Sequence, residues 1–165
     1  MEIKIKKMKN FLNSLVLAFI LSLFVTPVQV HAANINLTVR DGASIIFSGA
    51  VSLPTGLTSL NDATGTSRTI DPNSVLAVLG SADQASDDFF ISNLTYFNSF
   101  NSLYLKCVTD SNGEKCDNWQ YTVNNLYPGV GMDQNILSGG ESVYVYFGPQ
   151  NRIILGSGSI NTSDT

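Results

Sequence analysis

Two cysteines that flank a tight-turn signal constrain this chain more than any other feature of its sequence. Cys107 and Cys116 stand at comparable distances from Asn112-Gly113, a dipeptide that tolerates the positive φ angles of a two-residue hairpin turn. Paired strands on either side of that turn would bring the cysteines opposite each other, where a disulfide can close. Because the enclosed loop is short, the expected stabilisation is about 2–3 kcal/mol. We therefore predict a stapled hairpin at the centre of a small β-rich domain.

The first 32 residues have the organisation of a secretory signal peptide. Lysines concentrate in Met1–Asn10, an apolar stretch follows over Phe11–Val25, and Val30-His31-Ala32 offers the small residues that signal peptidase accepts. We expect cleavage after Ala32 and export to a compartment where two cysteines form a disulfide. The apolar run is short for a membrane span, which needs about 20 residues. An uncleaved leader is the alternative, and it is the only membrane attachment that we expect.

Removal of the leader leaves an acidic chain without histidine. Four of the nine Lys and Arg residues and one of the thirteen Asp and Glu residues precede residue 33, so 5 basic and 12 acidic residues remain, a net charge of −7. Such a surface repels nucleic acid and anionic lipid, and neither is expected as a partner. The single histidine, His31, leaves with the leader. Serine-type triads and the usual zinc sites need histidine, so we expect no enzyme, no catalytic residues and no metal site.

The first part of the mature chain predicts two strands and a loop. Alternating apolar and polar residues over Ile35–Arg40 predict a half-buried strand. Asp41-Gly42 is a hairpin turn signal, and Ser44–Leu53 follows as a second strand. Thr55–Ser67 is rich in Gly, Thr, Ser, Asn and Asp, and we predict a surface loop there.

One helix and four further strands are predicted after this loop. Asp71 is expected to cap a helix with Pro72 at its first position, and the helix is expected to end near Gln84. Further strands are predicted over Phe89–Tyr96, Leu103–Val108, Trp119–Val123 and Val143–Phe147. This order favours the α+β class and a ubiquitin-like β-grasp fold, in which a mixed or antiparallel sheet packs on one short helix. The expected organisation is a signal peptide over 1–32, one domain over 33–149 and a tail over 150–165.

Several short motifs together resemble the transcobalamin-like C-terminal domain family. The more specific motifs are Asn118–Asn124 (Asn-Trp-Gln-Tyr-Thr-Val-Asn), Tyr127-Pro128 and Gly131-Met132-Asp133, followed by a turn over Leu137–Glu141 and the strand Val143–Tyr146. The resemblance covers most of the mature chain and implies a β-grasp fold. In vertebrate cobalamin carriers the similar domain covers one side of the corrin ligand, and a helical partner domain covers the other. Cobalamin is therefore the cofactor that the resemblance implies, although we expect no helical partner domain in this chain. Similar bacterial domains occur in exported and surface proteins.

The candidate ligand-binding residues follow the predicted hairpin. Trp119 either stacks on a ligand or packs in the core, and core packing is the simpler interpretation. Tyr127 lies in a Tyr-Pro-Gly loop and is better placed to meet a ligand. Gly131, Met132 and Asp133 follow in the same loop, where glycines either shape a binding loop or simply permit a sharp turn.

The acidic residues fit structural roles better than catalytic ones. Asp110–Glu114 resembles a calcium loop, but it lacks the remaining spaced ligands and the distal bidentate glutamate, so hairpin turn chemistry explains it better. Asp87 and Asp88 with Glu114 or Asp117 would supply the two carboxylates of a glycosidase. Nothing in the sequence indicates that these residues converge.

The sequence therefore predicts a secreted or cell-surface, non-catalytic binding module with an unidentified extracellular ligand or cell-surface partner. The alternative is a structural or adhesive surface domain without a small-molecule site. A concave patch lined by Tyr127, Met132 and an exposed Trp119 would favour the first hypothesis. Buried rings beneath a flat polar surface would favour the second.

Overall fold

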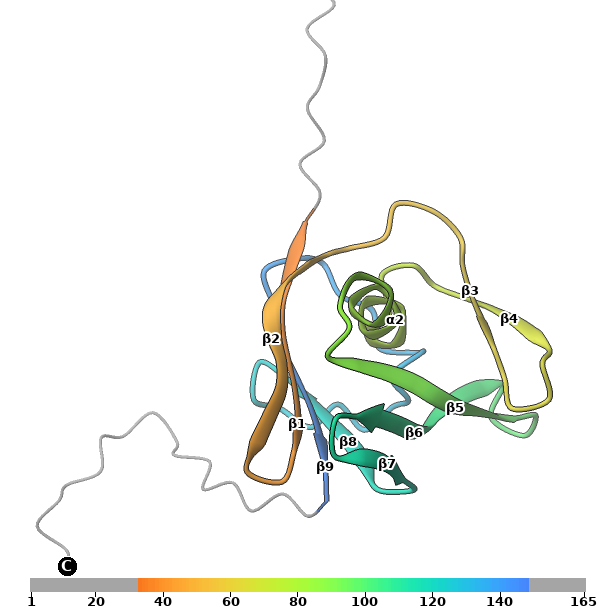
Figure 1. Ribbon diagram of the computed structural model, residues 1–165. Coiled ribbons are helices and arrows are strands. Elements are labelled where there is room, and N and C mark those ends of the chain that lie inside the picture. Colours follow the sequence, from red (N-terminus) through yellow and green to blue (C-terminus); the bar gives the residue numbers. More distant parts are fainter. Residues whose placement is uncertain (1–32, 149–165) are drawn as a thin grey trace, which may run out of the picture. The chain divides into compact units, whose positions relative to one another are not determined.

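The computed structural model describes residues 33–148, which contain nine strands and one helix (Figure 1). The predicted leader and tail lie outside the described residues. None of the described residues belongs to a helix long and apolar enough to cross a membrane. The helix is α2 (Val75–Ala85), and the strands are β1 (Asn34–Asp41), β2 (Ser44–Ser52), β3 (Thr58–Asn61), β4 (Ser67–Ile70), β5 (Phe89–Phe97), β6 (Ser102–Asp110), β7 (Gly113–Cys116), β8 (Trp119–Val123) and β9 (Ser142–Phe147).

Four strands form the main sheet in the order β2-β1-β9-β8. The central pair β1 and β9 runs parallel, and the two outer pairs are antiparallel. The predicted alternation in β1 is confirmed, because Ile35, Leu37 and Val39 are buried in the core. Figure 1 shows α2 end-on between β2 and β5. The α+β class predicted from the sequence is therefore present, with mostly sheet and one short helix.

A second sheet of three antiparallel strands, β5-β6-β7, contains the stapled hairpin. Cys107 and Cys116 are direct register partners and form a disulfide, as predicted. The Asp110 carboxylate accepts a hydrogen bond from the Asn112 amide, and Gly113 adopts a positive φ of 107°. The two sheets meet where the ring of Phe47 packs edge-on against Phe89, with centroids 5.9 Å apart.

Helix α2 begins later than the sequence predicts. Its N-cap is Ser74, whose hydroxyl oxygen accepts a hydrogen bond from the Ala77 amide at 3.2 Å. The Asp71 carboxylate instead accepts from the Asn73 amide within a turn, so the prediction of Asp71 as N-cap is wrong. The first free amides of the helix, those of Val75 and Leu76, donate to carbonyl oxygens in the loop after β8. That long-range loop therefore fixes the start of the helix.

The predicted surface loop over Thr55–Ser67 is wrong, because most of this stretch belongs to the hairpin β3–β4. Its centre is Asp62, which is 7% exposed and accepts hydrogen bonds from the amides of Thr64 and Thr66. The Arg68 Nε donates to the same carboxylate at 2.9 Å, and the Arg68 guanidinium lies 3.8 Å from the Tyr96 ring centroid. Polar residues thus build this hairpin and attach it to β5.

The Asp62 network predicts a pH-dependent contribution to stability. Hydrogen bonds from Thr64, Arg68 and Thr66 lower the pKa of Asp62 from 3.8 to about 2, against the opposing effect of burial. A lowered folded-state pKa stabilises the fold above the unfolded pKa, and this contribution is lost as the pH falls from about 4 towards 2. We therefore expect the stability difference between wild type and Asp62→Asn to shrink over that interval, as measured by urea unfolding at several pH values. Asp117→Asn is a matched control, because Asn tolerates the φ of 69° at that exposed position. A stability difference that stays constant with pH would contradict the prediction.

Candidate functional site

An aromatic groove of about 480 Å³ lies between the β5–β6 turn, strand β8 and the loop that follows β8. Its rim consists of Phe97, Phe100, Tyr127 and Val130. Phe100 and Tyr127 are 72% and 68% exposed, and the other two side chains are about half exposed. A folded domain seldom gathers large exposed apolar side chains around one depression without a binding role. The aromatic groove is therefore the leading candidate site among residues 33–148.

The floor of the aromatic groove is part of the hydrophobic core. Buried side chains from two strands and the loop form it, namely Leu103, Leu105, Trp119, Tyr121 and Met132. Polar side chains at the margin are Ser102, Gln120 and Gln134, and no Lys, Arg, Asp or Glu among residues 33–148 lines the groove. This lack of charge contrasts with the excess of acidic residues over residues 33–165. A neutral ligand with an apolar face fits such a surface.

Tyr121 holds the loop that forms one wall of the aromatic groove. Its hydroxyl donates to the carbonyl oxygens of Val130 and Gly131, at 2.8 and 3.2 Å. Burial raises the pKa of Tyr121 to about 12, so the phenol keeps its proton at physiological pH. The ring of Tyr121 is buried in the core, and its hydroxyl positions the candidate loop.

Asp133 ties the same loop to strand β6. Its carboxylate accepts hydrogen bonds from the Ser102 hydroxyl at 2.8 Å and the Leu103 amide at 2.7 Å. A Cβ added at Gly131 would lie only 2.7 Å from an Asp133 carboxylate oxygen and 2.8 Å from the Ser102 hydroxyl. A side chain at position 131 would therefore have to displace this bridge, in which both carboxylate oxygens of Asp133 are used.

The structure brings four of the five predicted ligand-binding residues to the aromatic groove. Trp119 is 4% exposed and donates from its indole Nε1 to the Lys115 carbonyl oxygen at 2.9 Å, in agreement with the core interpretation. Met132 is buried in the groove floor, Tyr127 projects at the rim, and Gly131 lies in the wall. Asp133 does not line the groove but supports the loop from behind.

Sequence reasoning missed the aromatic residues of the β5–β6 turn. Phe97 and Phe100 at this turn, together with Tyr104 on β6, line the groove. Two phenylalanines within a short polar turn were an available signal, since turns favour Gly, Asn, Asp and Ser.

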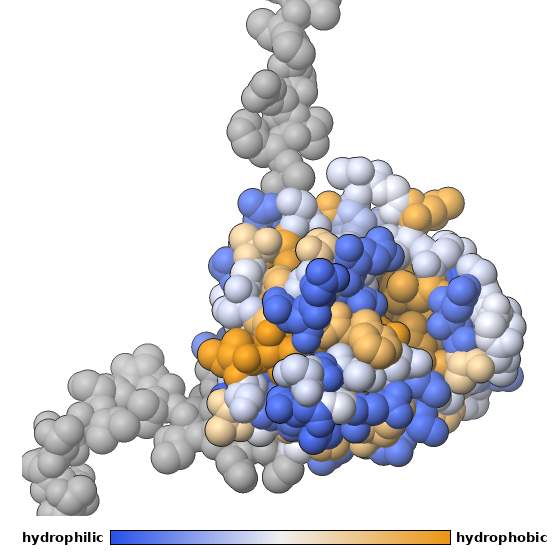
Figure 2. Space-filling view, in the orientation of Figure 1, coloured by the Kyte–Doolittle hydropathy of each residue, from blue (hydrophilic) through white to orange (hydrophobic). Residues whose placement is uncertain are grey.

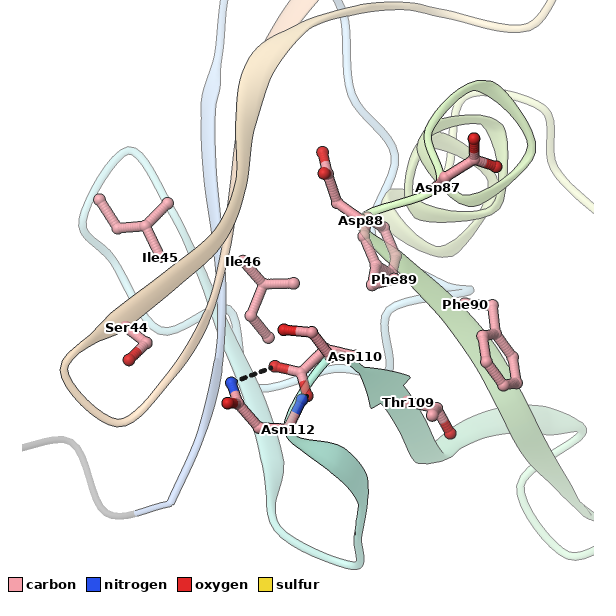
Figure 3. Close-up of a pocket in the computed structure, with 11 residues that line it drawn as sticks. Ser44, Ile45, Ile46, Asp87, Asp88, Phe89, Phe90, Thr109, Asp110 and Asn112 are labelled. Atoms are coloured by element: carbon pink, nitrogen blue, oxygen red, sulfur yellow. Dashed lines mark hydrogen bonds between the residues drawn. The ribbon is translucent and has the colours of Figure 1, made fainter.

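A second cleft, of about 450 Å³, lies between the β1–β2 and β6–β7 turns and contains several carboxylates (Figure 3). Asp87, Asp88 and Asp110 line it, whereas Glu114 and Asp117 do not. The Asp88 carboxylate accepts from the Ser86 hydroxyl, and that of Asp110 accepts from the Asn112 amide. The carboxylates of Asp88 and Asp110 thus serve local turns. Glu114 lies near both cysteine sulfurs, but the disulfide leaves no thiolate there for metal binding.

Comparison of the chain with protein-family models, with curated proteins and with solved structures finds no match.

Proposed function

We propose that the protein is a secreted or cell-surface, non-catalytic binding module whose ligand occupies the aromatic groove. The observation that carries this proposal is the concentration of exposed rings, from Phe97, Phe100 and Tyr127, around an uncharged depression. Aromatic faces and hydrogen-bonding margins are typical of small-molecule sites. The disulfide supports an oxidising, extracellular location.

We further propose the β-grasp fold for the described domain. Three observations support it: the strand order β2-β1-β9-β8, the parallel central pair and the single helix α2 packed near β2. The resemblance to transcobalamin-like C-terminal domains is retained as part of this proposal. It makes a corrinoid one of two ligand classes to test, and a neutral oligosaccharide is the other, because both present an apolar face with polar edges.

The alternative is a structural or adhesive domain without a small-molecule site. The observation in its favour is that Trp119, Tyr121 and Asp133 all make internal hydrogen bonds. Titration with cyanocobalamin and with chitotetraose separates the two functions. The protein has a single tryptophan, and Trp119 forms part of the groove floor, so its emission reports directly on occupancy. Saturable emission change and a raised melting temperature with either compound would support the binding module. No response to either would favour the structural alternative.

Tyr127 is expected to contribute to binding and very little to folding. Its ring is 68% exposed, so Tyr127→Ala should change the free energy of unfolding by less than about 0.5 kcal/mol. Loss of its stacking surface should weaken ligand binding roughly tenfold. Isothermal titration calorimetry with whichever of the two compounds binds tests this expectation. Leu57→Ala is the matched control, because Leu57 is more exposed and does not line the groove. Equal affinity of the Tyr127→Ala variant and wild type would place the ligand elsewhere.

A further inference from the structure

Strand β2 forms an unprotected edge of the main sheet. Within the described residues it pairs only with β1, and Figure 1 shows it at the outer side of the sheet. Proteins usually protect such edges with charged residues, proline or bulges. Ser44–Ser52 contains no charged residue and no proline, and its single bulge lies at Ile46, near one end. The regular edge therefore extends over Phe47–Ser52.

Strand β5, at the edge of the second sheet, is an example of a protected edge in this protein. The outer strand β5 of the second sheet has its Ile91 amide bonded to the Asp83 carboxylate. Its Leu94 carbonyl oxygen accepts from the Ala63 amide of the β3–β4 hairpin. Within residues 33–148, by contrast, the backbone groups of β2 form hydrogen bonds only with β1. The outward amides and carbonyl groups of β2 are thus available to another strand.

An apolar hollow accompanies this open edge. A cavity of about 550 Å³ lies between β2 and the last turns of α2, where Ser81, Ala82 and Ala85 form its helical wall. Phe47 and Val51 line it from the strand. Figure 2 shows hydrophobic residues gathered over β2 in the same region. A strand added beside β2 would extend the sheet along this hollow and could fill it with apolar side chains.

We propose that β2 is a self-association interface, in which a second copy of the chain adds its own β2 antiparallel across a two-fold axis at Gly49. This register is self-complementary: Phe47 lies opposite Val51 of the second copy, and Ser48 lies opposite Ala50 of the second copy. Apolar residues then meet on the helix side, and small residues meet on the outer side. The absence of charge lets two acidic copies approach along this edge without like charges in contact.

Sedimentation velocity across a wide concentration range tests the interface. Wild type is expected to show a reversible monomer–dimer equilibrium. Ser48→Lys places a charge on the exposed face of the edge and should weaken association roughly tenfold or more. Ser67→Lys makes the same change on exposed strand β4 and should leave association unchanged. A monomer at every concentration, or a dimer insensitive to Ser48→Lys, would overturn the proposal.

Disulfide trapping tests the register. An equimolar mixture of the Ser48→Cys and Ala50→Cys variants should cross-link under mild oxidation faster than either variant alone, because only the mixture places two new cysteines opposite each other. Equal rates in all three samples would overturn the two-fold at Gly49. Slow exchange of the outward amides of Phe47–Ser52, which are not bonded to β1, in a monomer would show that another segment of the same chain occupies the edge, and would also overturn the proposal.

Discussion

Replacing Asp133 with alanine is expected to lower the free energy of unfolding by about 3 kcal/mol. The carboxylate accepts two hydrogen bonds, from the Ser102 hydroxyl and from the Leu103 amide. Each bond has a charged acceptor, and such bonds contribute more than neutral ones. Leu103 is buried, so its amide would be left without a partner and would carry a desolvation cost. Urea unfolding monitored by circular dichroism measures the loss.

Two further variants show whether the effect comes from the bridge. Asp133→Asn keeps one acceptor oxygen in the same shape, so it should lose less stability than Asp133→Ala. Gly131→Ala leaves Asp133 in place but adds a methyl group 2.7 Å from its carboxylate oxygen, and should therefore also disturb the bridge. If Asp133→Ala were as stable as wild type but bound ligand more weakly, Asp133 would be a ligand-binding residue rather than a support for the loop.

The disulfide, the alternation of buried and exposed residues in β1 and the last strand, over Val143–Phe147, could be predicted because their causes are local. Asn112-Gly113 determines the turn, and the turn then places Cys107 opposite Cys116. The alternation in β1 likewise requires only that one face of the strand be buried. Features of this kind depend on residues within a few positions of one another.

The features that were missed depend on residues far apart in the sequence. Polar content over Thr55–Ser67 predicted a loop, but Arg68 stacks on Tyr96 and thereby holds a hairpin against β5. The start of α2 depends on carbonyl oxygens of Met132 and Asn135. The aromatic groove combines three segments, so its existence could not be read from Tyr127 and its neighbours alone.

Trp119→Ala is expected to be the most damaging single substitution near the groove, with a loss of about 4 kcal/mol in the free energy of unfolding. The indole is 4% exposed and packs against the Phe147 ring, with centroids 5.4 Å apart. Its removal would leave a cavity between β8 and β9 and free the Lys115 carbonyl oxygen of the stapled hairpin. Circular dichroism is the appropriate probe, because this variant has no tryptophan.

Trp119→Phe separates the packing of the ring from its hydrogen bond. Phenylalanine keeps most of the aromatic volume but cannot donate to Lys115, so a loss of about 1 kcal/mol for the missing bond is expected, together with a smaller packing loss. A stability loss below about 1 kcal/mol for Trp119→Ala, together with weaker ligand binding, would contradict the core role and return Trp119 to the set of ligand-stacking residues. A large stability loss for Trp119→Ala would instead confirm its core role. Ligand contact would then fall to the exposed rings of Tyr127 and Phe100 at the rim, while the floor of the groove would serve mainly to hold the two sheets together.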